Sequence, residues 1–122
     1  MPDGQGFALR TTREASTVWV ALGGELDVYA TPSLRAALGN VEEAGVDTIV
    51  LDLRGLEFLD SSGLAVLLGA HERAAARGNS DVKLLIKGSH AVENLFETLR
   101  AGEFLDIVED PEALTGAASA SE

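Results

Sequence analysis

Hydroxyl and carboxylate side chains gather between Phe58 and Leu64, where Ser61 and Ser62 directly follow Asp60 and precede Gly63. Asp and Ser are favoured at helix starts, because their oxygens accept hydrogen bonds from the free backbone N–H groups of the first turn. Ser61 and Ser62 remain near the start of this helix, at the edge of the sheet, and are expected to be exposed. Taken alone, the stretch indicates a purely structural helix cap formed by Asp60.

A second set of candidates is acidic, because Asp52, Glu57 and Asp60 cluster around the expected end of a strand. In a receiver domain, Asp52 would be the phosphorylated residue. Such a domain needs an acidic pair after its first strand to hold magnesium, and residues 7–16 supply none. Phosphate-binding loops of the Gly-x-x-x-x-Gly-Lys type are absent, as is cysteine. We therefore expect no catalytic residue, no metal, no cofactor and no enzymatic activity.

The elements that must position these residues begin with a hairpin. The first half of the chain predicts strands over 7–12 and 17–22 around a polar turn at 13–16, a helix over 32–44, and a buried strand over 48–53. Gly23 and Gly24 are expected to break the second strand. Thr31 and Pro32 combine a capping residue with a first-turn proline, which marks the start of the helix.

The second half alternates helices and strands. It predicts a helix over 60–77, a strand over 82–86, a helix after Ser89 that Gly102 stops, a strand over 104–108, and a brief helix after Asp110-Pro111. The inward faces of the two longer helices are expected to be Leu64, Leu67, Leu68, His71 and Ala74 or Ala75 in one, and Val92, Leu95, Phe96 and Leu99 in the other. This alternation predicts an α/β fold, a mixed sheet with helices packed against it.

Length and charge limit the functions further. The 122 residues fit one domain, and 20 acidic against 9 basic residues give a net charge of −11, which disfavours nucleic acid as a partner. No signal peptide is recognisable, and the longest apolar run, residues 64–70, is far below the roughly 20 residues that cross a membrane. We expect a cytoplasmic protein without membrane insertion. Its expected parts are an N-terminal extension (1–6), a domain (7–114) and a flexible tail (115–122).

Two motifs together resemble a known family. Gly24-Glu25-Leu26-Asp27 and the stretch from Phe58 to Leu64 are similar to the "GELD" turn and the "F-(M/L)-D-S-(S/T)-G-L" motif of STAS domains, specifically of bacterial anti-sigma factor antagonists. The resemblance implies a four- to five-stranded sheet and phosphorylation of Ser61, with Ser62 as the second choice. It also implies a partner-binding site formed by Asp27, Asp60, Ser61, Ser62, Gly63 and Leu64.

The family's cycle gives the implied function. The unphosphorylated protein binds an anti-sigma factor that is itself a serine kinase and so releases a sigma factor; phosphorylation of Ser61 blocks this binding, and a serine phosphatase restores it. The stretch from Val28 to Ala30 is expected to tune which partner is recognised. The alternative is a STAS accessory subunit of a membrane transporter, including lipid ABC systems. Ser61 together with residues 24–27 favours the first interpretation.

Overall fold

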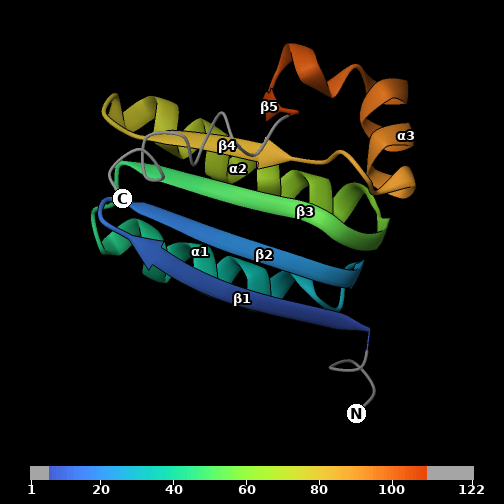
Figure 1. Cartoon of the computed structure of the whole chain (residues 1–122), viewed down its shortest axis with the longest axis horizontal. Helices are drawn as coiled ribbons and strands as arrows, with labels where there is room; N and C mark the ends of the chain where they lie inside the picture. The colour runs from blue at the N-terminus through green and yellow to red at the C-terminus, as the bar shows by residue number, and fades with distance from the viewer. Residues whose placement is uncertain (1–5, 110–122) are drawn as a thin grey trace.

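A mixed five-stranded sheet forms the centre of the molecule (Figure 1). The computed structural model describes residues 6–109. Its elements are β1 (Phe7–Glu14), β2 (Thr17–Leu26), α1 (Thr31–Glu43), β3 (Thr48–Leu59), α2 (Ser61–Arg77), β4 (Asp81–Leu85), α3 (His90–Leu99), the 3-10 helix η2 (Ala101–Glu103) and β5 (Asp106–Val108). The strands follow the order β1-β2-β3-β4-β5, antiparallel between β1 and β2 and parallel elsewhere. The predicted α/β fold is confirmed.

The hairpin is confirmed, but its strands are longer than predicted. β1 and β2 pair from Phe7↔Gly24 to Glu14↔Thr17, so the turn shrinks to two residues, of which Ala15 adopts a left-handed conformation with φ 56°. The prediction that the glycines break β2 is wrong. The strand continues through them to Leu26, because β3 still pairs with it there, with register irregularities on either side of the Gly23–Gly24 step.

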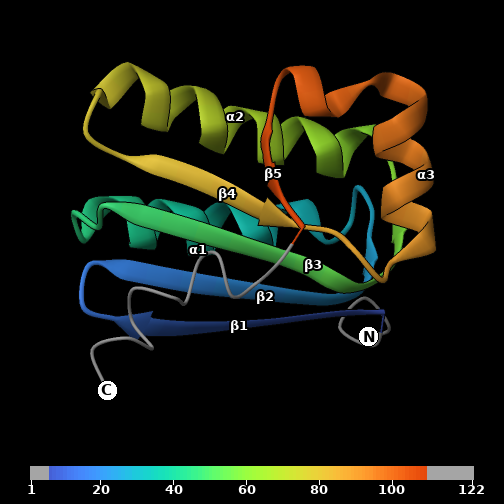
Figure 2. The same cartoon turned by 45° about the horizontal axis from the view of Figure 1, so that its top comes forward.

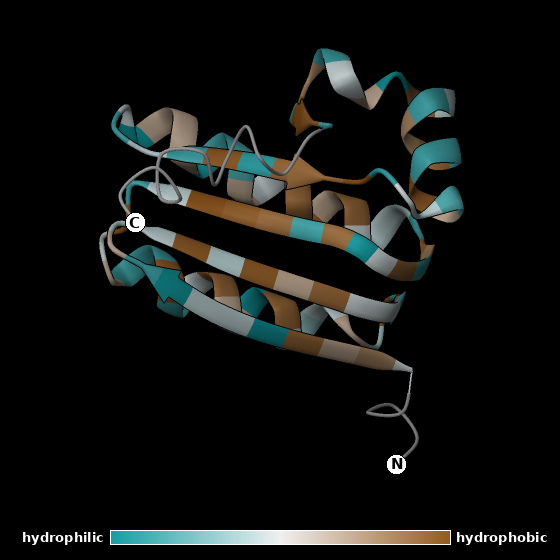
Figure 3. Cartoon of the chain, in the orientation of Figure 1, coloured by the Kyte–Doolittle hydropathy of each residue, from teal (hydrophilic) through white to brown (hydrophobic). Residues whose placement is uncertain are grey.

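β3 also runs further than the predicted end at Leu53. Its first five residues pair with both β2 and β4, whereas the remainder pairs with β2 alone as far as Leu26↔Leu59. Arg54 and Glu57 are exposed in this second half, which explains why the apolar run stopped in the sequence while the strand did not. Figure 3 shows the hydrophobic residues alternating along β2 and forming a longer run in the first half of β3.

Helices α1 and α2 lie side by side on one face of the sheet, and α3 stands at the end of the sheet beside the second half of β3 (Figure 2). The core lies between the helices and the sheet. Its largest fully buried side chains are Leu26, Leu34, Leu38, Ile49, Leu51, Leu53, Leu67, Leu84, Leu85, Val20, Val50 and Val82.

Helix α2 is rotated slightly from the predicted orientation. Val66 and Ala70 are buried, whereas Leu68 and His71 are half-buried and Ala75 is exposed. In α3, Val92 and Phe96 are buried as predicted, Leu95 is half-buried and Leu99 is 46% exposed. The buried face of α2 is therefore shifted around the helix, and the buried face of α3 is narrower than its sequence predicted.

Several element ends differ from the prediction. Ala30, not Thr31, is the N-cap of α1, and the Thr31 hydroxyl instead donates to the Val28 carbonyl at 3.0 Å. Helix α3 ends before Gly102, because Arg100 adopts the left-handed conformation with φ 55°. β5 begins only at Asp106, since Ala101 to Glu103 form the 3-10 turn.

Some predictions lie outside the described residues, namely the helix after Asp110-Pro111, the domain end at 114 and the tail at 115–122. Residues 1–5 of the expected N-terminal extension also lie outside the described residues. Within residues 6–109, no helix combines the length and apolar character needed to cross a bilayer.

Candidate functional site

Both sequence motifs lie at the same edge of the sheet. β2 and β3 are parallel and finish together at Leu26↔Leu59, so the segments that follow them leave the sheet side by side. The Asp60 N–H donates to the Leu26 carbonyl at 3.4 Å and joins the two strand ends. We call Asp27 to Ala30 the acidic loop and Asp60 to Gly63 the serine turn.

Asp60 caps helix α2, as predicted. Its Oδ1 accepts a hydrogen bond from the Ser62 hydroxyl at 2.6 Å and another from the Gly63 N–H at 3.0 Å. These bonds, first of all the one from Ser62, hold the pKa of Asp60 below its ordinary value, because they favour the charged carboxylate. A fixed negative charge therefore stands at the start of α2 at neutral pH.

The structure separates the two serines. The Ser62 side chain is half-buried and donates to Asp60. Ser61 is exposed as the first residue of α2, and its hydroxyl has no hydrogen-bond partner among residues 6–109. Of the two hydroxyls, only that of Ser61 is both open to solvent and uncommitted within the described chain.

Gly63 and Leu64 are placed inside the molecule. Gly63 is buried against Leu26 and Leu59, and Leu64 is 7% exposed within the core cluster. Their contacts hold the first turn of α2 against the ends of β2 and β3. These two residues therefore position the serine turn and offer a partner little surface of their own.

Asp27 organises the acidic loop. Its Oδ1 accepts hydrogen bonds from the Tyr29 N–H at 3.0 Å and the Ala30 N–H at 3.1 Å, and its carbonyl accepts from the N–H groups of Ala30 and Thr31. This turn leads directly into α1. It also turns the side chains of Val28 and Tyr29 outward, to 56% and 78% exposure.

An exposed apolar side chain that the sequence analysis missed precedes the serine turn. Phe58 is 45% exposed in β3, beside Glu25 and beyond the reach of β4. Leu56 and Leu59 on either side of Phe58 are buried, so burial in this part of β3 does not follow the two-residue period, and no sequence signal marked Phe58 as exposed. With Val28 and Tyr29, it adds apolar surface to the two segments that carry Asp27 and Ser61, a feature typical of protein interaction sites.

The acidic cluster expected around a strand end does not form. Asp52 lies within β3, where it pairs with Ala21 and Leu85, and its carboxylate binds Arg54 at 2.8 Å. Burial raises the pKa of Asp52, but the hydrogen bonds and charge of Arg54 outweigh this, so the pKa lies below its ordinary value. Across residues 6–109, no three His, Cys, Asp or Glu side chains are grouped so that they could hold a metal ion.

Comparisons with known proteins agree on one family. A family model described as "Mlab, STAS domain" matches residues 9–108. The anti-sigma-B factor antagonist of Staphylococcus aureus is 30% identical over 105 residues, which cover 85% of this chain and 94% of the relative. That of Staphylococcus epidermidis is 30% identical over 94 residues, covering 76% and 84%.

Solved structures show the same architecture. The anti-sigma factor antagonist SpoIIAA in its unphosphorylated form superposes with a TM-score of 0.74 at 27% identity, covering 92% of this chain and 97% of its own. The Bacillus cell fate determinant SpoIIAA in the phosphorylated form gives 0.69 at 27% identity, covering 90% and 99%. An anti-sigma factor antagonist from Mycobacterium paratuberculosis gives 0.82 at 23% identity, covering 95% and 96%, and shows the shared fold.

Proposed function

The chain belongs to the STAS domain family, and we propose that it is an anti-sigma factor antagonist whose binding to its partner is switched off by phosphorylation of Ser61. The observation that carries the proposal is the exposed, uncommitted Ser61 hydroxyl at the start of α2, beside the acidic loop. The names of the relatives support the same role. The function is one of binding, in the cytoplasm, without catalytic residues or a cofactor.

The proposed partner is an anti-sigma factor with serine kinase activity. The unphosphorylated chain binds it through Asp27, the serine turn and the exposed apolar side chains of Val28, Tyr29 and Phe58. This binding releases the sigma factor. The kinase then phosphorylates Ser61, the complex separates, and a serine phosphatase resets the chain. SpoIIAA, which has been solved in phosphorylated and unphosphorylated forms, provides a precedent for two such states in a relative.

A phosphate at Ser61 has the electrostatic strength that such a switch needs. It adds about −1.5 to −2 charges at pH 7, and burying this charge against a partner without matching cations costs several kcal/mol. Moving a complex from almost fully bound to almost fully free takes about 5.5 kcal/mol of differential affinity. One phosphate within the contact surface is therefore of the right size.

The same phosphate should leave the fold intact. An anion at a helix N-terminus is favoured by about 0.3–1 kcal/mol, which offsets part of the repulsion from the neighbouring Asp60 carboxylate. Because Ser61 is exposed and its hydroxyl makes no hydrogen bond within residues 6–109, no internal contact of the described chain is lost when it is modified. The switch would act by local repulsion of the partner.

Substitution of the serines tests the proposal. With the partner kinase and ATP, intact mass should show one added phosphate on wild type and on Ser62→Ala, and none on Ser61→Ala. Ser33→Ala is the matched control, because Ser33 is another exposed serine in the first turn of a helix. Full phosphorylation of Ser61→Ala would contradict the assignment and make Ser62 the next candidate.

Binding provides the second measurement. Ser61→Asp should weaken kinase binding by about 100-fold, because it places an unmatched charge in the interface, while its melting temperature stays that of wild type. Ser61→Ala should bind like wild type. Equal binding by all three proteins would refute the switch even if Ser61 accepts phosphate.

The alternative, a STAS subunit docked on a membrane transporter, predicts a different partner. Pull-down from a lysate separates the two, since a soluble kinase-like protein supports the antagonist and a membrane ATPase supports the transporter subunit. The curated relatives reported above are all anti-sigma factor antagonists, which favours the first outcome.

A further inference from the structure

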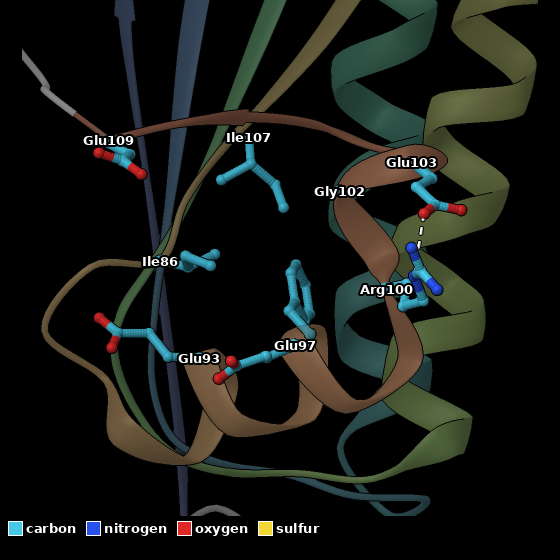
Figure 4. A pocket seen from close by; sticks show the side chains of 9 residues that line it. Ile86, Glu93, Glu97, Arg100, Gly102, Glu103, Ile107 and Glu109 are labelled. Carbon is cyan, nitrogen blue, oxygen red and sulfur yellow. Dashed lines mark ion pairs between the residues drawn. The ribbon is translucent and has the colours of Figure 1, made fainter.

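A hollow of about 390 Å³ lies between α3, η2 and β5 (Figure 4). Its floor is apolar, because Phe96 is 3% exposed and Ile86 and Ile107 are half-buried. Four carboxylates surround this floor: Glu93, Glu97, Glu103 and Glu109. None of these residues belongs to the site of the proposed function.

Two of these four carboxylates have hydrogen-bond or ion-pair partners among residues 6–109, and two do not. Glu103 pairs with Arg100 at 3.0 Å, and Glu93 accepts a hydrogen bond from the Gly88 N–H at 2.7 Å. Glu97 and Glu109 are exposed and have no hydrogen-bond or ion-pair partner within residues 6–109. Two free negative charges therefore face solvent beside an apolar floor.

The hollow extends into a groove. An adjoining space of about 290 Å³ shares Ile86, Glu93, Ile107 and Glu109 with it and adds Lys87. The groove is open to solvent on one side, whereas small-molecule sites enclose most of their ligand. Its shape suits a segment of another protein better than a small molecule.

Charge decides among the possible occupants. Four glutamates against Arg100 and Lys87 leave the lining with a net negative charge, which repels anionic lipids and nucleic acids. Residues 110–122 of the chain itself contain Asp110, Glu112 and Glu122 and no lysine or arginine, so their charge also has the wrong sign. A second copy carries a net charge of −11 and would be repelled at long range. A partner with basic side chains next to apolar ones complements both the rim and the floor.

We propose that this groove, formed by α3, η2 and β5, docks a basic, amphipathic segment of a partner protein. Apolar side chains of that segment cover Ile86, Phe96 and Ile107, while its lysine or arginine side chains pair with Glu97 and Glu109. The groove shares no lining residue with the serine turn, so phosphorylation of Ser61 alters none of the side chains that would contact this partner.

A synthetic peptide provides the probe. A short helical peptide with leucine on one face and lysine on the other is titrated into the ¹⁵N-labelled full chain, and amide shifts are followed by NMR. We expect the largest shifts at Gly88, Gly102 and Ile107, around the groove. A lysine–serine peptide, which has the charge without the apolar face, and a glutamate–leucine peptide, which has the apolar face with the opposite charge, should leave these amides unmoved.

Charge-matched variants identify the surface. Glu97→Gln/Glu109→Gln should weaken binding of the lysine–leucine peptide about tenfold, as expected for two lost charge pairs. Glu43→Gln/Glu72→Gln removes the same charge from exposed positions on α1 and α2 and should bind within about twofold of wild type. Equal weakening in both variants would mean general attraction to an acidic protein and would overturn the proposal. Shifts at the groove that grow with protein concentration alone would assign it to a second copy and would also overturn it.

Discussion

Gly63 is the most tightly enclosed residue of the serine turn. A Cβ atom added there would lie 2.8 Å from Leu26 Cγ, 2.8 Å from Leu59 Cδ1 and 2.9 Å from the Leu26 carbonyl oxygen. The carbonyl belongs to β2 and cannot move aside alone. We therefore expect Gly63→Ala to lower the free energy of unfolding by about 1–3 kcal/mol, as overpacking does, measured by urea denaturation.

The matched control for this substitution is Gly39→Ala in α1, where an added Cβ meets no atom within 4 Å. Alanine favours a helix interior over glycine, so this variant should gain about 0.5–1 kcal/mol. A loss of similar size in both variants would show that the packing around Gly63 is not the cause.

Asp60 makes a prediction about pH. Its pKa is lowered in the folded chain by the Ser62 hydroxyl and the Gly63 N–H, so between the folded and unfolded pKa values the unfolded chain binds more protons. The cap therefore stabilises the fold above the ordinary Asp pKa of about 3.9 and is lost as the pH falls through the folded value. The melting-temperature advantage of wild type over Asp60→Asn should shrink on acidification. A constant advantage at every pH would contradict the role of the charge.

At the residue scale, the sequence predicted the cap at Asp60 and located both serines, because these depend on local chemistry. It could not separate Ser61 from Ser62 by contacts, since that depends on which hydroxyl the helix turns toward the Asp60 carboxylate. The exposure of Phe58 was also out of reach, because it depends on where β4 stops pairing with β3.

At the scale of elements, Ser89 links α3 to the sheet. Its buried hydroxyl donates to the Leu56 carbonyl of β3 at 2.6 Å and accepts from the Val92 N–H at 3.3 Å. Ser89→Ala leaves both buried groups without this partner and removes a helix cap. It should lower the free energy of unfolding by about 1–3 kcal/mol, as measured by urea denaturation.

Ser33→Ala is the control for Ser89, because Ser33 is exposed near the start of α1 and its side chain makes no hydrogen bond within residues 6–109. Its unfolding free energy should stay within about 0.5 kcal/mol of wild type. If Ser89→Ala also stayed within that range, the link between α3 and β3 would contribute nothing.

The order of helices and strands was predictable because apolar residues recur with a different period in each. Several boundaries of these elements were not predictable. β2 passes through Gly23 and Gly24 because its neighbours supply hydrogen bonds there, which a single strand's composition does not reveal. Arg100 ends α3 in a left-handed conformation that glycine usually adopts. The sequence therefore predicted that the helix would end at the next glycine, Gly102.

At the scale of the whole molecule, a net charge of −11 opposes folding by self-repulsion. An exposed ion pair such as Arg100–Glu103 contributes little in compensation. Added salt should therefore raise the melting temperature at pH 7, because it screens the repulsion more than it weakens these pairs.

The control for this salt effect is pH itself. Near the isoelectric point of about 4.4, the net charge vanishes and the stabilisation by sodium chloride should disappear. A rise of the same size at both pH values would point to a general salting-out effect and not to relief of charge repulsion.

The contact of Gly63 with β2 and β3 has a consequence for how a signal could be used. The first turn of α2 packs so closely on the ends of β2 and β3 that not even a methyl group fits between them at Gly63. A phosphate on Ser61 would therefore act by changing the surface charge that a partner meets, and not by moving distant parts of the chain. Removal of the phosphate would restore the binding surface without a slow conformational change, so the rates of the kinase and the phosphatase would set the duration of each cycle.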